Sequence, residues 1–333
     1  MMKKTLLALS LLGLSSSALA IENGKAESPA NYPSLVEMNC TGTIIASKWV
    51  MTAAHCTENS VYLVGAVNES NSKVAYINEK YKPESGDFAL WKLNDKVFFD
   101  KSLFLSDYFV ENDYSKVYTG LGFGQTGRNL NSATFKVRGA YTGIQNLSLE
   151  TLTEAHTVPG DSGSPLLDED KKIVGIHYGS NNPAGDSIVR HASATRISYV
   201  APFILSTIDA WHTQTIGSVA AGQSTTIEVQ SLHVNPVVDD ASVTGDINID
   251  VANSSCMTGQ IEPFSICTYT VSSTNGYEGV LTLGAGQTVI FNKGKSKPVE
   301  PPKPDTGGSS GGSLSIFSLL GLVLLFTRRK AIR

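Results

Sequence analysis

The stretch that decides the fold reads WVMTAAHC and occupies residues 49–56. It begins with bulky apolar side chains, which are typical of a buried strand, and it ends with His55 directly before Cys56. Cys40 lies 16 residues before Cys56, so a disulfide between the two would pin the loop of His55 to a neighbouring strand. We therefore expect His55 to hold a fixed place at the end of a β-strand.

Two further segments add the groups that a nucleophilic site needs. DFALWKL, at residues 87–93, puts Asp87 at the start of an apolar strand, where a carboxylate can be buried against an imidazole. GDSGSP, at residues 160–165, sets Ser162 between glycines, which permit the tight backbone that aims two N–H groups at one point. Each segment alone is more often structural, but the three in this order predict nucleophilic catalysis by a serine.

Together the three segments resemble the trypsin and chymotrypsin family, and the match runs from residue 21 to about residue 211. The resemblance implies an all-β fold with two β-barrels and the activity of a serine-type endopeptidase, a hydrolase that acts through an acyl-enzyme. It makes Ser162 the nucleophile, His55 the general base and then acid, and Asp87 the group that fixes the imidazole tautomer. The backbone N–H groups of Gly160 and Ser162 would form the oxyanion hole.

The first 20 residues follow the pattern of a secretory signal peptide. Two lysines precede an apolar run at residues 6–14, and Ala-Leu-Ala at residues 18–20 forms a small-x-small cleavage site. The apolar run is too short for a membrane span. We expect residues 1–20 to be removed, so that the mature chain begins at Ile21.

The residues after this site suggest how the enzyme is activated. Ile21-Glu22-Asn23-Gly24 resembles the mature amino terminus of the same family, whose freed ammonium folds inward and pairs with the aspartate before the nucleophile. That aspartate is Asp161 here, and the ion pair would hold the loop of Gly160 and Ser162 in its productive form. No propeptide separates Ala20 from Ile21, so we expect signal-peptide removal itself to expose the activating amine.

Three residues are candidates for the pocket that receives the substrate side chain before the cut. Trypsins carry an acid six residues before the nucleophile, where this chain has His156, which cannot attract a cation. Thr157 and His177, five residues before and fifteen after Ser162, resemble the pair that binds a glutamate carboxylate in glutamyl endopeptidases. His156 or His191 could add a second positive group. We expect a preference for Glu before the cut, with cleavage after Lys or Arg as the alternative.

The pattern of short apolar runs and turn residues predicts two all-β domains. Short runs rich in Val, Ile, Tyr and Phe fill residues 21–213, which we assign to the protease domain, and an amphipathic helix is expected at 198–211. Residues 214–292 repeat short strands, one of them expected at 243–251, with turn residues every 8 to 12 positions. This spacing predicts a small immunoglobulin-like β-sandwich.

The end of the chain resembles a sorting signal. A Pro/Gly/Ser linker at 293–313 leads into a tail at 314–333, which holds an apolar segment and a basic stop and is short for a permanent anchor. Gly311-Gly312 resembles the bacterial Gly-Gly C-terminal sorting tail, which implies removal by a rhomboid-type sorting protease. We expect a protein outside the cell or on the outer surface of a Gram-negative bacterium, exported through the periplasm, with membrane contact only through this tail.

Four cysteines in an exported chain suggest two disulfides, and four can pair in three ways. Nearest-neighbour pairing, Cys40 with Cys56 and Cys256 with Cys267, would keep one bridge in each domain. Metal binding is the alternative, but the chain has no Cys-x-x-Cys spacing and the compartment is oxidising. We expect neither a metal nor a cofactor, because acyl transfer needs only the triad, the oxyanion donors and water.

Charge restricts the partners. The 333 residues hold 26 basic and 30 acidic side chains, and removal of both ends takes away six basic ones, which leaves 20 against 30 and a net charge of −10. A nucleic-acid partner is therefore not expected. We expect a monomer that acts on protein or peptide substrates. The alternatives are a catalytically inactive binding protein that kept the fold, or a sandwich domain that sets the biological function by binding a surface ligand.

Overall fold

The computed structural model describes residues 21–108, 115–124, 127–139, 145–181, 190–284 and 286–298.

The first barrel carries the segments of His55 and Asp87. Six antiparallel strands close the first barrel in the order β2-β3-β4-β8-β7-β5: β2 (Leu35–Glu37), β3 (Thr41–Ile45), β4 (Trp49–Thr52), β8 (Ala89–Leu93), β7 (Val74–Tyr81) and β5 (Ser60–Leu63). Their inward side chains, among them Val36, Ile44, Val50 and Trp91, form one buried core.

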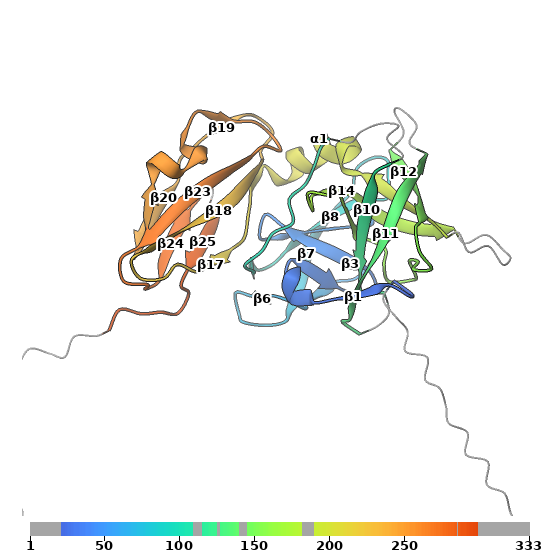
Figure 1. Cartoon of the computed structure of the whole chain (residues 1–333), viewed down its shortest axis with the longest axis horizontal. Helices are drawn as coiled ribbons and strands as arrows, with labels where there is room; N and C mark the ends of the chain where they lie inside the picture. Colours follow the sequence, from blue (N-terminus) through green and yellow to red (C-terminus); the bar gives the residue numbers. More distant parts are fainter. Residues whose placement is uncertain are drawn as a thin grey trace, which may run out of the picture. The chain divides into compact units, whose positions relative to one another are not determined.

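The second barrel carries the loop of Ser162. It is built from β10 (Val117–Gly122), β11 (Leu130–Gly139), β12 (Asn146–Thr151), β13 (Pro165–Leu167), β14 (Ile173–Asn181) and β15 (His191–Arg196). The pairing of β11 with β12 closes these strands into a ring, and β1 (Lys25–Glu27) adds to the outer edge of β11. Two closed barrels confirm the predicted double-barrel fold, and Figure 1 shows them in blue and green.

Between the barrels runs a stretch at residues 97–106, which we call the connecting segment. It begins in β9 (Val97–Phe98), which pairs with β6 (Val67–Asn68), and its end lies parallel to the start of β14 through a bridge from Leu105 to Ile173. A short 3-10 helix, η1 (Pro29–Asn31), precedes β2. Leucines of the connecting segment share a buried core with both barrels.

One helix, α1 (Ile197–Ile208), follows the second barrel, and it is shorter than predicted. Val200, Ile204 and Ile208 are buried at the expected spacing of four residues. The helix ends because Asp209 adopts a left-handed conformation with φ 40°, whose N–H donates to the carbonyl of Leu205. The predicted continuation to residue 211 is therefore wrong, since those residues belong to a strand.

The C-terminal domain consists of two four-stranded sheets that share a core. The first sheet has the order β16 (Ala210–His212), β18 (Gln223–Leu232), β23 (Ile266–Ser273), β21 (Asn248–Asp250), and the second β17 (Ile216–Gly217), β25 (Thr288–Phe291), β24 (Gly279–Thr282), β20 (Ser242–Gly245). Both contribute side chains to one buried cluster that includes Trp211 and Phe291. A small ladder, β19 (Val237–Val238) with β22 (Gln260–Ile261), and two 3-10 helices, η2 (Val251–Asn253) and η3 (Ser255–Met257), complete it.

Two details of this β-sandwich differ from the prediction. The strand expected at 243–251 is divided into β20 and β21, because Gly245 has φ 75° and turns the chain. The sheet also begins at Ala210, ahead of the predicted boundary after residue 213, since β16 pairs with β18. The immunoglobulin-like assignment stays a prediction.

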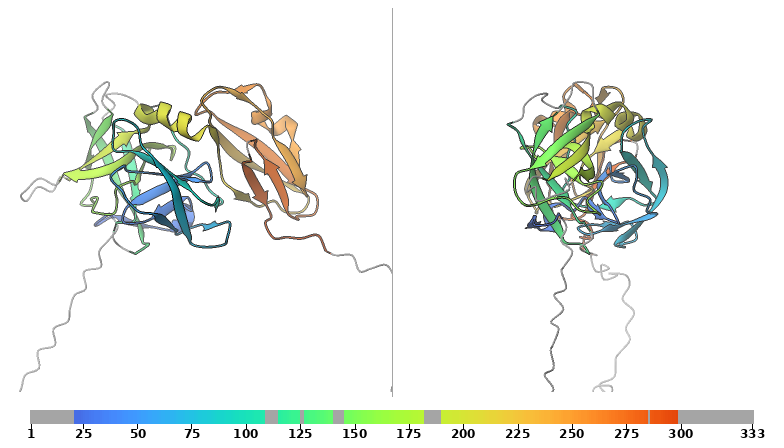
Figure 2. Two further views of the ribbon diagram at one scale, coloured as in Figure 1. Left: turned by 180° about the vertical axis from the view of Figure 1, so that it is seen from behind. Right: turned by 90° about the vertical axis from the view of Figure 1, so that its right-hand side faces the viewer.

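Both cysteine pairs form disulfides with the nearest-neighbour pairing, Cys40–Cys56 in the first barrel and Cys256–Cys267 in the sandwich. The barrels and the sandwich belong to one compact unit that ends at Ser296. Figure 2 shows the same arrangement from behind and from the side. The predicted signal peptide, the greater part of the linker and the sorting tail lie outside the described residues. Within the described ranges, no helix has the length and apolar character that a bilayer span requires.

Candidate active site

His55 and Asp87 are brought together by strand pairing. Antiparallel β4 and β8 place Thr52 opposite Ala89, so the loop that follows β4 lies beside the residue that precedes β8. The Nδ1 atom of His55 lies 2.7 Å from Oδ2 of Asp87, and the backbone N–H of His55 donates to Oδ1 at 3.1 Å. The two side chains are 46% and 28% exposed, so substrate can reach the imidazole. Because Nδ1 is engaged, Nε2 is the nitrogen that can exchange a proton with a hydroxyl.

The nucleophile loop is tied to the same region by Thr41. This residue follows Cys40, whose disulfide partner Cys56 is next to His55. The backbone N–H of Thr41 donates to the carbonyl of Ser162 at 2.7 Å, and its hydroxyl donates to the carbonyl of Gly160 at 3.0 Å. The loops of His55 and Ser162 are therefore joined through one disulfide and two hydrogen bonds, although they come from different barrels.

Two glycines of this loop are required by close packing. Gly163 has φ 87°, and a Cβ there would lie 2.0 Å from the carbonyl oxygen of Thr41. Gly160 has φ 99°, and a Cβ there would lie 2.4 Å from the backbone of Gly124. A side chain at either position would push the loop away from its neighbours. The N–H groups of Gly160 and Ser162 donate to no group within the described ranges, so both are available to an oxyanion.

The carboxylate of Asp161 lies in a buried site lined by backbone N–H groups. It is fully buried, its Oδ1 accepts from Gly124 N–H and its Oδ2 from Val158 N–H, both at 2.8 Å. The N–H of Ile21, itself fully buried, also donates to this carboxylate. Burial raises the pKa of Asp161 to about 6, although the three N–H donors favour the charged form. The site thus brings together the two residues that the sequence predicted as an activation pair.

His177 belongs to the second barrel and lies near His55 and Asp87. It lies in β14, its N–H donates to the carbonyl of Ser164 at 2.9 Å and its carbonyl accepts from Gly163 N–H at 2.7 Å. The side chain is buried, which lowers its pKa to about 4, and its ring N–H donates to the carbonyl of Ser193. The imidazole is therefore neutral at physiological pH, and it lies close enough to His55 to feel its charge.

The other pocket candidates have different partners. Thr157 is buried, and its hydroxyl makes a hydrogen bond to the hydroxyl of Ser180, which the sequence analysis did not identify. His156 turns instead toward Glu22, with Nε2 3.2 Å from the carboxylate and with its backbone N–H bonded to the Glu22 carbonyl. His191 contacts Arg138 at 3.2 Å. Ser180 follows His177 in the same strand, so a serine three residues after the pocket histidine was the available signal in the sequence.

A cavity of about 480 Å³ has His55, Asp87, Gln145 and Tyr178 in its wall. Among the described residues, the group closest to a metal-site arrangement is Cys40, His55 and Cys56, but both sulfurs belong to the disulfide and cannot act as thiolates. The arrangement supports nucleophilic acyl transfer at the junction of the two barrels.

Two β-barrels with a histidine–aspartate pair and a Gly-Asp-Ser-Gly loop at their junction define a serine-type endopeptidase, a hydrolase of peptide bonds. The chain belongs to the trypsin family, whose family model, described as Trypsin, matches residues 21–204. No curated protein matches the chain.

Several solved structures resemble it. Neuropsin, a serine protease expressed in the limbic system of mouse brain, is 21% identical with a TM-score of 0.46, and the match covers 56% of this chain and 99% of neuropsin. The VesB protease of Vibrio cholerae is 16% identical with a TM-score of 0.42, covering 80% of this chain and 98% of VesB. The secreted serine protease VesC from Vibrio cholerae is 16% identical with a TM-score of 0.43, covering 80% and 70%.

Proposed function

We propose that this chain is an exported bacterial endopeptidase that uses Ser162, His55 and Asp87 and cleaves after Glu. The observation that carries the catalytic assignment is the joined pair of loops, in which His55 is bonded to Asp87 and Thr41 bonds the backbone of Ser162. The observations that favour Glu are the bonded hydroxyls of Thr157 and Ser180 and the buried imidazole of His177, which lies in the same strand as Ser180.

The proposed reaction assigns each of these residues a step. Ser162 Oγ attacks the peptide carbonyl carbon while Nε2 of His55 takes its proton, and Asp87 stabilises the imidazolium through Nδ1. The oxyanion accepts hydrogen bonds from the N–H groups of Gly160 and Ser162, and loss of one such donor typically costs about 3 to 4 kcal/mol. His55 then protonates the leaving amine. Water attacks the acyl-enzyme by the same proton route and returns Ser162 to its free form.

The pocket can stabilise a carboxylate in two ways. While the hydroxyls of Thr157 and Ser180 stay bonded to each other, one of their two protons can turn toward a substrate oxygen, and a hydrogen bond to a charged group contributes about 1.5 to 3 kcal/mol. A Glu carboxylate beside His177 would also favour the protonated imidazole, which burial disfavours in the free enzyme. We assign His156 to the Glu22 contact and thus to the amino terminus, since its ring is already paired there.

A peptide panel that differs only at the residue before the cut tests the preference. Glu, Gln, Asp, Lys and Leu peptides of otherwise identical sequence are compared by kcat/KM. We expect Glu to exceed its uncharged isostere Gln by about tenfold or more, because Gln leaves the carboxylate site half satisfied. Faster cleavage after Lys would instead support the trypsin-like alternative and would end the proposal for Glu.

The chain's export is part of the same proposal. Two disulfides suit an oxidising compartment, and the predicted signal peptide and Gly-Gly tail would direct the protein through the periplasm to the outer surface. Fractionation of producing cells, followed by mass spectrometry of both termini, tests it. We expect a first residue of Ile21 and a last residue near Gly311. A full-length chain in the cytoplasm would contradict this part.

A further inference from the structure

We infer that Gln230 and His212 of the β-sandwich are positioning residues for catalysis, which act through the connecting segment on strand β14. The inference goes beyond the proposed function, because it assigns the sandwich a role in the geometry of the protease. It requires that the sandwich bond the connecting segment, that the segment bond β14, and that the barrels alone hold the segment weakly.

Gln230 bonds both backbone polar groups of one residue of the connecting segment. It is fully buried, its Oε1 accepts from the N–H of Leu105 at 3.0 Å and its Nε2 donates to the carbonyl of Leu105 at 2.7 Å. The same Nε2 donates to the carbonyl of Phe264 at 3.0 Å. The side chain therefore imitates a neighbouring strand for Leu105, whose backbone groups would otherwise be buried without partners.

His212 makes a second clamp two residues earlier in the segment. Its ring is fully buried, with Nδ1 accepting from the N–H of Ala46 at 3.1 Å and Nε2 lying 2.9 Å from the carbonyl of Leu103. Since Ala46 N–H must donate, the proton of the neutral ring lies on Nε2 and is donated to Leu103. His212 thus joins the first barrel, the connecting segment and the sandwich at one point.

The opposite edge of the connecting segment is bonded to β14. The N–H of Ile173 donates to the carbonyl of Phe104 at 2.7 Å, and the N–H of Ser106 donates to the carbonyl of Ile173 at 2.9 Å. Residues 104–106 therefore form a parallel extension beside the first residue of β14, as the bridge between Leu105 and Ile173 also shows. Four residues later the same strand presents His177, whose backbone bonds both Gly163 and Ser164.

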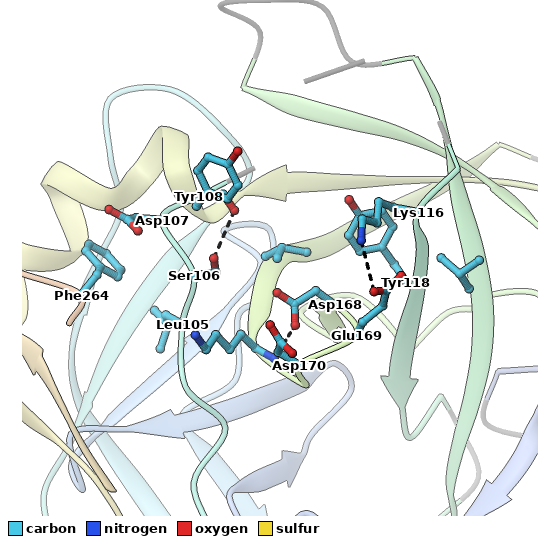
Figure 3. A pocket seen from close by; sticks show the side chains of 13 residues that line it. Leu105, Ser106, Asp107, Tyr108, Lys116, Tyr118, Asp168, Glu169, Asp170 and Phe264 are labelled. Atoms are coloured by element: carbon cyan, nitrogen blue, oxygen red, sulfur yellow. Dashed lines mark hydrogen bonds and ion pairs between the residues drawn. The ribbon is translucent and has the colours of Figure 1, made fainter. Parts of the chain in front are cut away.

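Two clefts border the connecting segment, although its leucines are buried in the core that they share with the barrels. A cavity of about 360 Å³ lies against Leu105 and Ser106, and Figure 3 shows it between Phe264 of the sandwich and the turn of Asp168 and Asp170. Residues 101–104 line part of a second cavity, of about 590 Å³. Removal of the Gln230 amide would leave the N–H and C=O groups of Leu105 without their partners in a buried position. Loss of the sandwich bonds should therefore let the segment and the start of β14 move.

The test compares Gln230→Met with a matched control in the full chain. Within the sandwich, Gln287 bonds the backbone of Trp211 in the same way. Its Oε1 accepts from the N–H of Trp211 and its Nε2 donates to the carbonyl, both at 2.6 Å. Gln287→Met therefore removes an equivalent pair of bonds. Each variant is titrated with a fluorophosphonate and assayed on whichever peptide the unsubstituted enzyme cleaves best. A failed Glu preference therefore leaves this test intact, and per-site rates exclude misfolded protein from the comparison.

We expect Gln230→Met to lower kcat/KM per titrated site by about tenfold or more, since a displacement of about 1 Å at remote positions can cost that much. Gln287→Met should lie within about twofold of the unsubstituted enzyme, because its bonds stay inside the sandwich. If both variants kept the rate of the unsubstituted enzyme, the inference would be overturned. A loss of the same size in both would also overturn it, since that would reflect general destabilisation.

Amide hydrogen exchange of the unsubstituted chain gives a result that does not depend on a variant folding. If the sandwich holds the connecting segment, the N–H groups of Leu105 and Ile173 should become exchangeable at the denaturant concentration that opens β18 and β23. Protection of these two amides after the sandwich strands have exchanged would show that the barrels hold the segment alone, and would refute the inference.

Discussion

Asp161 offers a quantitative test of activation by the amino terminus. With an amide rather than an ammonium at Ile21, burial places the pKa of Asp161 at about 6 instead of 3.8, and at 1.36 kcal/mol per pKa unit this corresponds to about 3 kcal/mol. That energy opposes the charged form of the carboxylate, which we propose orders the loop of Ser162. A free ammonium at Ile21 would offset it, which corresponds to about a hundredfold change in the population of the ordered loop.

The perturbation is one extra glycine ahead of Ile21. We expect the chain that starts at Ile21 to exceed the extended chain in kcat/KM by up to about a hundredfold, and Asp161→Asn to lose a similar factor. Combining the two changes should cost no more than either alone, because both remove the same ion pair. Equal activity of the extended chain and the chain that starts at Ile21 would refute the reasoning.

The same pair predicts a pH dependence of stability, measured by urea unfolding of a Ser162→Ala chain, which cannot digest itself. In the extended chain the folded pKa of Asp161 is raised, so its contribution is fully present below pH 3.8 and is lost as the pH rises through about 6. The free energy of unfolding should fall by about 3 kcal/mol over that range. In the chain that begins at Ile21 this decrease should be absent or smaller.

Three shorter predictions concern other residues. Burial lowers the pKa of His212 to about 4 from 6.5, so its stabilising effect is complete above pH 6.5. The free energy of unfolding should fall by about 3 kcal/mol as the pH drops through 4. Urea titrations should find this loss reduced in His212→Gln. Replacing Cys40 and Cys56 by alanine opens a loop with a separation of 16 residues, which gives the unfolded chain more conformational entropy. The free energy of unfolding should fall by about 3 kcal/mol. A loss below about 1 kcal/mol would contradict this reasoning. Thr157→Val should raise KM for Glu peptides about tenfold and leave Leu peptides unchanged; parallel changes for both would remove Thr157 from the carboxylate site.

The sequence was most informative where neighbouring residues determine the structure. The apolar run before His55 and the glycines around Ser162 predicted the strand and the tight loop, because both depend on local side-chain size and backbone freedom. The helix after the second barrel was predicted too long. Trp211 continues the helical spacing of apolar residues, but the left-handed Asp209 ends the helix and the indole packs in the sandwich core instead.

Contacts between distant parts of the chain escaped the sequence analysis. Thr41 bonds residues about 120 positions away, and nothing in its neighbourhood distinguishes it from other strand threonines. Gln230 is likewise an ordinary strand residue until the fold brings Leu105 beside it. His156 was counted with the pocket from its spacing to Ser162, yet the chain near Ile21 supplies Glu22 as its partner.

Labelling with a fluorophosphonate, followed by peptide mapping, tests the catalytic assignment most directly. The label should be found on Ser162 alone, and it should disappear together with peptide hydrolysis in Ser162→Ala, while His55→Ala should slow both by several orders of magnitude. Modification of another residue, or peptide hydrolysis that persists in Ser162→Ala, would contradict the account.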